Sequence, residues 1–375
     1  MRTYSGESLR NKGCIGILTK DTDSIPRGNH ILYKDNLSMS DFGFRGYVTK
    51  DSKLPLFSKS GLKIPNELDI THHIDDIVKI SADGKIYVLW ENSCSQNALY
   101  LTDACNVNCI MCPQPQKQHD KIHIETARSV LDLLVRKKVE HMCITGGEPT
   151  LIRSNFIEIL TRCTTEHPDA SLQVLTNGQT FSEFEFAKRC AELSTPKTCY
   201  CVSMHGDTPL THDLIVQREG AFSKVHASLY NLSKLNVGIE VRFVVSKLNY
   251  TRLPGLAEFF FRTYPFVHHF AIMGLEMTGC AAKNAKEVWI DPTEYREELD
   301  KFVVEAERRG INFSIYNHQL CVIPVRAWKY AKKSISDWKC NHITMCNECM
   351  VKDKCGGFFT TSNNLISEGI HPVCL

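Results

Sequence analysis

The sequence predicts an α/β protein built around a partial (β/α)₆ barrel, with a small β-rich domain before it and a cysteine-rich extension after it. Three observations support this fold class. Candidate strands and amphipathic helical segments alternate from residue 98 onward, which indicates a parallel sheet with helices outside it. Short β-like runs broken by Gly, Asp, Asn and Pro fill the first 95 residues, and cysteines crowd residues 346–355 near the end. We therefore expect domains at residues 1–95, 96–310 and 311–375.

The N-terminal domain is predicted to be a small β structure. Its clearest hairpin pairs residues 77–81 with residues 85–90 around Asp83-Gly84, a strong turn signal between two alternating runs. Shorter runs at residues 14–19 and 30–33 are further candidate strands. No motif in this domain indicates its task. Covering the edge of a sheet and docking a substrate or partner are both open interpretations.

The barrel is predicted from six strand and helix units. Apolar residues at residues 127, 130, 131, 134 and 135 follow the helical repeat and predict a helix over residues 124–138. Asp291-Pro292 is predicted to open the last helix, with Asp291 as the cap and proline in the first turn. The six candidate strands are residues 98–102, 141–145, 171–176, 199–204, 239–246 and 268–273.

Catalytic groups in barrels of this kind gather on the loops that follow the carboxyl ends of the strands. Polar residues or glycines follow every predicted strand, which by itself is a weak signal because strand ends are usually polar. These residues are Thr102-Asp103, Gly146-Gly147-Glu148, Thr176-Asn177-Gly178, Ser203 with His205, Ser246 with Asn249, and Glu276.

Composition indicates a soluble protein of a reducing compartment, and we expect the cytoplasm. The 375 residues carry a formal charge of +2 without long runs of either sign, which disfavours a dedicated nucleic-acid binder. The first residues lack the apolar core of a signal peptide, and no stretch is apolar for long enough to span a membrane. In such a compartment the clustered members of the 17 cysteines favour metal binding over disulfides.

The first cysteine cluster is a C-x₃-C-x₂-C loop formed by Cys105, Cys109 and Cys112. Three thiolates can hold a [4Fe–4S] cluster and leave one iron open to a small molecule. A structural zinc site is the alternative, but zinc needs four protein ligands and no fourth cysteine or histidine stands at the usual offset. The loop alone leaves both interpretations open.

A second motif, Gly146-Gly147-Glu148-Pro149, begins 34 residues after Cys112 and favours the iron–sulfur cluster over zinc. A three-cysteine loop followed by a helical segment and an apolar run ending in Gly-Gly-Glu-Pro resembles the radical S-adenosylmethionine (SAM) superfamily. The resemblance implies that the three cysteines hold the cluster, that SAM binds its open iron, and that reductive cleavage of SAM yields a 5′-deoxyadenosyl radical. It also implies that Met111, before the third cysteine, lies near the adenine, although packing in the core is its alternative.

The same resemblance assigns further SAM-binding residues. Gly146 and Gly147 would let the backbone approach the ligand closely, and Glu148 with nearby carbonyl groups would take the ammonium group of SAM. Pro149 completes this motif. Residues expected at the ribose or carboxylate are Thr176, Asn177 and Ser203.

Arg242 lies within an apolar run, so its charge needs an anion. The carboxylate of SAM would supply it; a Glu or Asp of the barrel is the alternative. His205 has two interpretations, a structural histidine and a proton carrier. We expect His268 and His269 to be structural or partly exposed.

The second cysteine cluster is a C-x₂-C-x₅-C loop of Cys346, Cys349 and Cys355. It is similar to the SPASM/twitch extensions of radical SAM enzymes, which implies an auxiliary [4Fe–4S] cluster; zinc is the alternative. We expect Cys321 to be its fourth ligand, rather than Cys340 or the near-terminal Cys374.

Across about residues 77–372 the chain most resembles the C-type radical SAM maturases of the His-Xaa-Ser peptide systems. The shared motifs are Leu101-Thr102 with the cysteine loop, Gln114-Pro115, Thr145–Pro149, Ser334–Lys339 and Cys355–Phe359, while Pro113 and Gln116 depart from the pattern. The resemblance implies modification of a ribosomally made peptide with His-Xaa-Ser repeats.

The resemblance also implies partners, namely a second radical SAM maturase and an external electron donor of the flavodoxin or ferredoxin type. We expect no nucleic acid and no membrane partner. Two other functions stay open: a radical SAM enzyme of cofactor or modified-base synthesis, and an iron–sulfur partner subunit without turnover of its own. The intact cysteine loop and Glu148 disfavour the last.

Overall fold

The chain is divided into two compact units in a computed structural model. The first unit comprises Met1–Leu99, His123–Met142 and Thr165–Ala170, and the second comprises Tyr100–Ile122, Cys143–Thr164 and Ser171–Leu375. The structure describes residues 2–10, 12–23, 25–38, 40–55, 57–114, 123–135, 137–333, 340–360 and 365–374. The Ser334–Lys339 motif, Pro115 and Gln116 therefore lie outside the described residues.

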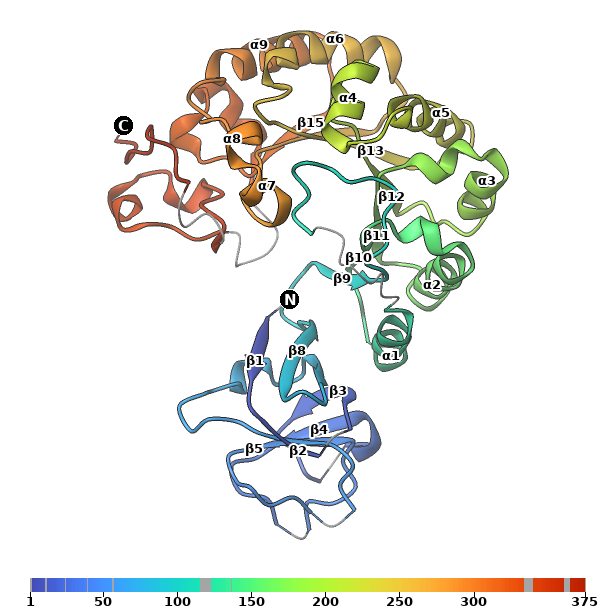
Figure 1. The fold of residues 1–375 in the computed structure, drawn as a ribbon, viewed down its shortest axis with the longest axis vertical. Coiled ribbons are helices and arrows are strands. Elements are labelled where there is room, and N and C mark those ends of the chain that lie inside the picture. Colours follow the sequence, from blue (N-terminus) through green and yellow to red (C-terminus); the bar gives the residue numbers. More distant parts are fainter. Residues whose placement is uncertain are drawn as a thin grey trace. The chain divides into compact units, whose positions relative to one another are not determined.

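The first unit contains an eight-stranded sheet with the order β1-β8-β7-β3-β4-β5-β6-β2, of which Figure 1 labels β1, β2, β3, β4, β5 and β8. The predicted hairpin is confirmed, because β7 and β8 pair antiparallel around a turn at Gly84. Its strands are β1 Thr3–Ser5, β2 Glu7–Arg10, β3 Cys14–Thr19, β4 His30–Tyr33, β5 Gly46–Thr49, β6 Gly61–Lys63, β7 Ile77–Ile80 and β8 Lys85–Trp90.

This sheet closes on itself at Gly6, because its two outermost strands are consecutive in the chain. β1 pairs with β8, and β2 pairs with β6. Gly6 between them donates its N–H to the Gly84 carbonyl at 2.8 Å, and a Cβ on Gly6 would lie 2.3 Å from the Lys63 carbonyl oxygen. Only glycine fits where these two carbonyl groups approach one segment.

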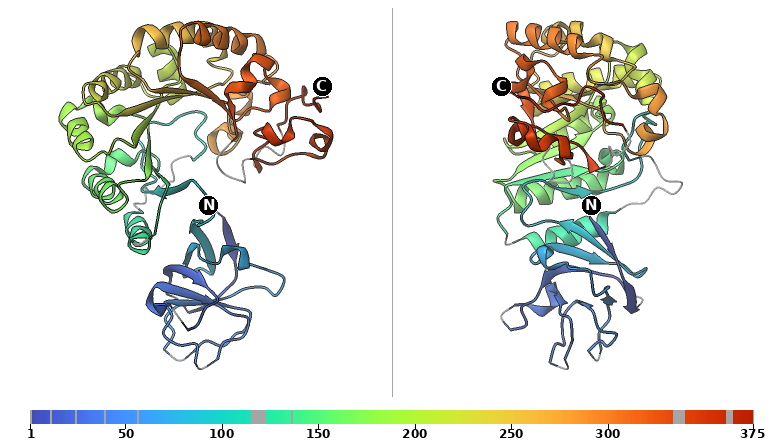
Figure 2. Two further views of the ribbon diagram at one scale, coloured as in Figure 1. Left: turned by 180° about the vertical axis from the view of Figure 1, so that it is seen from behind. Right: turned by 90° about the vertical axis from the view of Figure 1, so that its left-hand side faces the viewer.

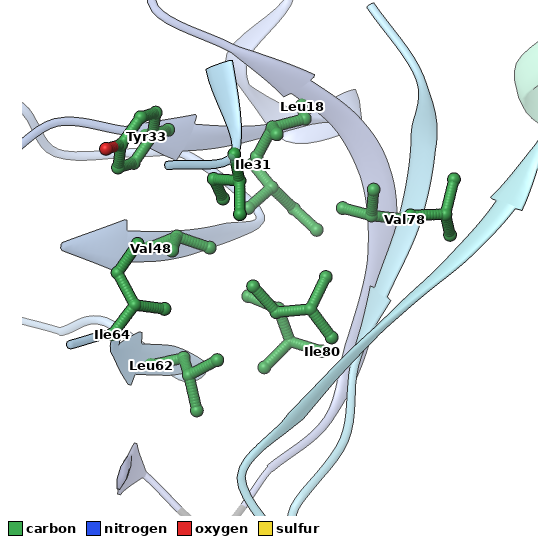
Figure 3. Close-up of a cluster of buried hydrophobic side chains, with 11 residues drawn as sticks. Leu18, Ile31, Tyr33, Val48, Leu62, Ile64, Val78 and Ile80 are labelled. Carbon is green, nitrogen blue, oxygen red and sulfur yellow. The ribbon is translucent and has the colours of Figure 1, made fainter. Parts of the chain in front are cut away.

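The interior of the closed sheet is an apolar core. Leu18, Ile31, Val48, Leu62 and Val78 are completely buried and point toward one another (Figure 3). They come from five different strands, so the strands are held by burial of one shared set of side chains. Helix α1, Ile124–Leu134, belongs to the same compact unit.

The second sheet has eight strands in sequence order from β16 to β9. The six predicted strands are all present, and β11 to β16 run parallel. Two short strands, β15 and β16, were not predicted. The bounds are β9 Asn97–Tyr100, β10 His141–Thr145, β11 Ser171–Thr176, β12 Thr198–Ser203, β13 Gly238–Val244, β14 His269–Met273, β15 Phe313–Tyr316 and β16 Ala331–Lys332.

Helices of this unit lie along the convex side of the curved sheet, as α3, α5, α6 and α9 show in Figures 1 and 2. The helices that follow α1 are α2 Arg153–Glu166, α3 Phe184–Glu192, α4 Pro209–Val216, α5 Ala221–Ser233, α6 Leu253–Thr263, α7 Gly279–Lys283, α8 Ala285–Val288 and α9 Arg296–Arg308. Short 3₁₀ segments include Pro149–Ile152, Gln179–Ser182, Leu320–Val322 and Val325–Tyr330.

Strand alternation separates a helix-facing side of this sheet from an inner side. On β13, Ile239, Val241 and Phe243 are buried, and Phe270 of β14 stacks on Phe260 of α6. The residues between these positions, including Arg242, face the inner side. The alternation therefore places the polar members of β13 inside the barrel.

Two helix boundaries differ from the prediction. Helix α1 ends at Leu134, and the last long helix, α9, begins at Arg296 rather than directly after Asp291. The Asp291 carboxylate instead accepts hydrogen bonds from the N–H and hydroxyl of Thr293, which forms a turn before the helix. It also accepts from the Ser367 hydroxyl at 2.5 Å and the Glu368 N–H at 3.0 Å, and so ties down the C-terminal segment.

Residues 311–375 lie in the same compact unit as the parallel sheet. Among the described residues, no helix is both long enough and apolar enough to cross a membrane.

Candidate active site

The C-x₃-C-x₂-C loop follows β9 and is held against the end of α4. The Asn108 N–H donates to the Val216 carbonyl at 3.1 Å, and the Ile110 N–H donates to the Ile215 carbonyl at 3.0 Å. A turn within the loop is closed by the Cys112 N–H and the Cys109 carbonyl at 3.0 Å. The backbone that carries the three thiols is therefore fixed by bonds to a helix more than 100 residues later in the chain.

Helix α7 holds the other side of this loop. The Cys280 N–H donates to the Cys112 carbonyl at 2.8 Å, and the Asn284 Nδ2 donates to the Ile110 carbonyl at 2.8 Å. Gly279 has a φ of +59°, and a Cβ there would lie 2.6 Å from the Cys112 carbonyl oxygen. The approach of α7 to the loop thus depends on a glycine.

The three predicted cluster ligands carry thiol groups that are neither fully buried nor fully exposed. Cys105 and Cys109 pack against Val107, Val216 and Ala221. Burial raises the pKa of the Cys105 thiol to about 11 and that of the Cys109 thiol to about 12, and neighbouring thiols add to the effect at Cys109. Thiolates at these positions therefore need a cation that stabilises them.

This donor set fits an iron–sulfur cluster. Soft thiolate ligands select zinc and iron–sulfur centres, and each thiolate of a [4Fe–4S] cluster binds a different iron. Among the described residues, no three His, Cys, Asp or Glu side chains gather tightly enough to bind a single metal ion. In this chain, Cys105, Cys109 and Cys112 would hold the cluster.

Gly146 and Gly147 pack directly against the chain that leads into the cysteine loop. The Gly147 N–H donates to the Thr102 carbonyl and the Glu148 N–H donates to the Ala104 carbonyl, each at 2.7 Å. A Cβ on Gly147 would lie 2.4 Å from the Ala104 carbonyl oxygen. These glycines were expected to admit a ligand; the structure adds a close approach of the chain to itself.

Glu148 is completely buried and links two of the predicted site loops. Its Oε1 accepts from the Thr150 N–H at 3.1 Å, the Thr150 hydroxyl at 2.6 Å and the Thr176 hydroxyl at 2.8 Å, while Oε2 accepts from the Asn177 N–H at 2.5 Å. Burial raises the pKa of this carboxyl, and the four donors oppose that effect. Its expected contact with the ammonium of SAM stays a prediction, as does any ligand contact of the buried Pro149, which opens a 3₁₀ segment.

Asn177 connects this loop to the cysteines. Its Nδ2 donates to Asn106 Oδ1 at 2.7 Å and lies 3.8 Å from the Cys105 sulfur. Thr176 and Asn177 were predicted from resemblance alone. The structure places both within the hydrogen-bond network that reaches the first cysteine.

Arg242 has an anion within its own strand. Its Nε donates to Glu240 Oε1 at 2.6 Å, so the pairing with a barrel Glu, one of its two interpretations, is observed, and its expected contact with the SAM carboxylate stays a prediction. Ser203 lies opposite Arg242 in the β12–β13 ladder. Ser203 therefore stands at the inner side of the sheet, where its expected SAM contact stays untested.

Met111 is 5% exposed and packs in an apolar cluster with Ile215, Met277 and Ala281. Core packing, one of its two interpretations, is therefore observed. His205 is buried, accepts from the Val244 N–H at 3.4 Å and has a pKa lowered by burial to about 3. The ring is thus neutral, which favours the structural interpretation over a proton carrier.

The structure brings the second cysteine cluster together with Cys321. Cys321, Cys346, Cys349 and Cys355 all line one small, mostly apolar cavity. Cys340 and Cys374 do not line it. These four thiols are the set expected for the auxiliary cluster, and their role as ligands stays a prediction.

Several residues at these sites were not predicted. Gly279, Cys280 and Asn284 approach the cysteine loop from about 170 residues away, and His342 and His371 line the C-terminal cavity. No spacing within the sequence marks them, since their relation to the cysteines exists only through the fold.

Fold and site together define a parallel α/β barrel with a three-cysteine loop and a Gly-Gly-Glu-Pro turn above it. Residues 99–259 match the Radical SAM superfamily. This part of the chain is thus similar to radical SAM domains.

Relatives with curated names include the mycofactocin maturase MftC of Mycobacterium tuberculosis H37Rv, which is 29% identical over 178 residues. That match covers 47% of this chain and 41% of the relative. The GTP 3′,8-cyclase of Aquifex aeolicus is 28% identical over 167 residues, or 43% of this chain and 51% of the cyclase. The chain thus spans about half or less of the length of these relatives.

Solved structures with a similar fold include SuiB of Streptococcus suis bound to its precursor peptide SuiA, with a TM-score of 0.47 and 15% identity. The match covers 59% of this chain and 48% of SuiB. A second is anSMEcpe with bound AdoMet, with a TM-score of 0.47, 20% identity, and coverage of 58% and 62%.

Proposed function

We propose that this chain is a radical SAM enzyme that modifies side chains of a ribosomally made peptide. The observation that carries the proposal is the three-cysteine loop, clamped between α4 and α7 and joined to the Glu148 network through Asn177. A bound [4Fe–4S] cluster with SAM would supply reductive cleavage of SAM to a 5′-deoxyadenosyl radical, which abstracts hydrogen from the substrate.

The residues of the chain position and enclose this chemistry. Cys105, Cys109 and Cys112 hold the cluster, and Glu148 fixes the loops after β10 and β11 so that Asn177 stays beside Cys105. The apolar cluster around Met111 keeps water from one side of the loop. Rigid support of this kind holds reactive groups within the narrow geometry that catalysis requires.

A second [4Fe–4S] cluster, held by Cys321, Cys346, Cys349 and Cys355, is part of the proposal. Their common cavity supports it, because the fourth thiol closes the iron that three loop cysteines would leave open. The extension is then of the SPASM/twitch kind.

The peptide substrate follows from the resemblance to the His-Xaa-Ser maturases, and similarity to a mycofactocin maturase agrees with a peptide-modifying class. We propose a peptide with His-Xaa-Ser repeats as substrate, with a second radical SAM maturase and a flavodoxin- or ferredoxin-type electron donor as partners in the cytoplasm.

A small-molecule enzyme is the second candidate. Its support is the similarity to GTP 3′,8-cyclase, at 28% identity over 167 residues against 29% over 178 residues for the maturase. A peptide enzyme should modify a peptide encoded beside its gene, whereas a small-molecule enzyme should leave every such peptide unchanged.

The test begins with anaerobic reconstitution, which should give close to eight irons per chain. With dithionite and SAM the protein should then release 5′-deoxyadenosine, and Cys109→Ala should abolish this release while the matched Cys199→Ala retains it. Undiminished release from Cys109→Ala would overturn the assignment of the SAM cluster. Co-expression with neighbouring candidate peptides and mass spectrometry would then test the substrate class.

A further inference from the structure

The inner side of the barrel carries a connected polar network on three adjacent strands. Glu240 and Arg242 of β13, His269 of β14 and Ser314 of β15 all stand at inner-side positions. Interiors of (β/α) barrels are usually packed with branched apolar side chains. A charged network at these positions therefore calls for an explanation beyond the fold.

Every polar atom of Glu240 is used within the network. Its Oε1 accepts from Arg242 Nε at 2.6 Å and its Oε2 pairs with His269 Nδ1 at 2.8 Å, while His269 Nε2 lies 3.0 Å from the Ser314 hydroxyl. Burial alone would raise the pKa of Glu240, but His269 and Arg242 outweigh it and lower the pKa to about 2. The carboxylate is thus a permanent anchor for the base of the Arg242 side chain.

The end of the Arg242 side chain is open. Within the described part of the chain, its only hydrogen bond is the one from Nε, so the two terminal nitrogens have no protein acceptor. The side chain is 20% exposed, against 9% for Glu240. A guanidinium held at Nε with two free NH₂ groups presents donors that match a planar acceptor with two oxygens.

The network also lies close to the cysteine loop. Val244, the next inner-side residue above Arg242, packs against the apolar cluster that contains Met111 of that loop. Two residues of a strand span about 7 Å. A group bound by Arg242 would thus be held below the loop, within the barrel.

Resting on the function proposed above, we propose that Arg242, fixed by Glu240, His269 and Ser314, binds a carboxylate group of the substrate. Charge favours a carboxylate over a phosphate. Glu240 already offsets the charge of Arg242, so a bound monoanion would leave one uncompensated negative charge, whereas a dianion would leave two. In the function proposed above SAM would bind at the open iron of the cluster, which would leave the Arg242 donors for the substrate.

The test is isothermal titration of the reconstituted, SAM-loaded protein with three isosteric probes. N-acetyl-L-glutamate α-amide offers a side-chain carboxylate, N-acetyl-L-glutamine offers a C-terminal carboxylate, and N-acetyl-L-glutamine α-amide is neutral. We expect at least one acid to bind tenfold or more tightly than the neutral probe. The preferred acid identifies whether the substrate presents a side chain or a chain end.

The variant Glu240→Gln/Arg242→Gln removes both charges together and so avoids leaving one buried charge unpaired. It should lose the preference for the acid. The control is Asp207→Asn/Arg252→Gln, which removes another Arg–carboxylate pair, with an exposed Arg252 and contacts of 2.6 and 2.8 Å, and should keep the preference. Iron content and circular dichroism check that each variant folds.

Three results would overturn the proposal. Equal binding of acid and neutral probes by the wild type shows that Arg242 serves Glu240 alone. A preference retained by the Glu240/Arg242 variant places the site elsewhere. A preference present only without SAM assigns Arg242 to the SAM carboxylate. Release of 5′-deoxyadenosine without substrate tests the proposed enzyme separately, so the two failures are distinguishable.

Discussion

Glu148 shows at the scale of one residue how a motif can have a structural task that its spacing does not reveal. The Gly-Gly-Glu-Pro motif was found in the sequence, but the four donors to its carboxylate come from Thr150, Thr176 and Asn177, of which Thr176 and Asn177 belong to the next loop. Hydrogen-bond partners that lie on another strand end cannot be deduced from local spacing.

Glu148→Gln should lower the free energy of unfolding by about 1–3 kcal/mol, because one amide N–H₂ group would face a buried donor in place of an acceptor. Chemical unfolding monitored by circular dichroism measures this. Glu183→Gln, at an exposed pair with Arg153, should change it by less than about 1 kcal/mol. An equal decrease in the free energy of unfolding in both variants would show that the buried network stabilises the fold no more than the exposed pair does.

His205, also a single residue, should make the stability of the fold depend on pH. Burial lowers its folded-state pKa to about 3, below the usual 6.5, so the unfolded chain binds more protons between these values. Stability is therefore fully present above pH 6.5 and falls as the pH drops toward 3. His205→Gln should reduce the slope of unfolding free energy against pH between 4 and 6 by up to about 1.4 kcal/mol per pH unit. An unchanged slope would contradict a buried neutral ring.

At the scale of elements, regular spacing in the sequence predicted the secondary structure well. Contacts between segments far apart in the chain were not predicted. The three-cysteine loop, six strands and the residue 77–90 hairpin follow periodicity or turn chemistry, which are local. Helix α7 was missed as a part of the site, because a five-residue helix has too few positions to show a pattern. Its contacts with Cys112 and Ile110 depend on how the barrel curves.

Asn284→Ala should weaken the hold of α7 on the cysteine loop. Loss of one hydrogen bond of about 0.5–1.5 kcal/mol predicts a loss of cluster iron that is up to tenfold faster under a chelator. Gly279→Ala should be more severe, since its φ is +59° and the new Cβ would meet the Cys112 carbonyl. Iron release followed by absorbance measures both, and Lys283→Ala, on the same helix, is the control. Equal iron retention in the Asn284, Gly279 and Lys283 variants would contradict the hypothesis that α7 holds the cysteine loop in place.

The C-terminal cavity allows an equally direct test of the fourth auxiliary ligand. Cys321→Ala should lower auxiliary iron or its EPR signal, since Cys321 lines the cavity with the three loop cysteines. Cys340→Ala and Cys374→Ala should keep full iron because neither lines it. Emptying of the site by Cys374→Ala alone would instead make the C-terminus the closing segment.

At the scale of the whole molecule, the sequence predicted both a β-rich N-terminal region and a parallel barrel, but not the grouping of the elements. Helix α1 was expected within the barrel domain, and it belongs to the unit of the closed sheet. The amphipathic repeat of α1 shows that one face is buried but not against which sheet. Closure at Gly6 was equally hidden, because a single glycine between two short runs is common.

Gly6→Val should open the N-terminal sheet, because a side chain there meets the Lys63 carbonyl oxygen. We expect a lower unfolding temperature and aggregation through the newly exposed strands, measured by calorimetry and light scattering. Gly28→Val is the matched control, since nothing lies within 4 Å of a Cβ at Gly28. An unaffected Gly6→Val protein would show that closure does not stabilise the unit.

The closed sheet also limits how this unit could recognise a peptide. A common mode of recognition adds the bound peptide as an extra strand, which requires a long row of unpaired backbone groups at a sheet edge. Here, among the described residues, the outermost strands are three and four residues long and are joined through Gly6. A leader peptide that docks on this unit must therefore be read by side chains on its loops or outer face, and its sequence should matter more than its ability to extend.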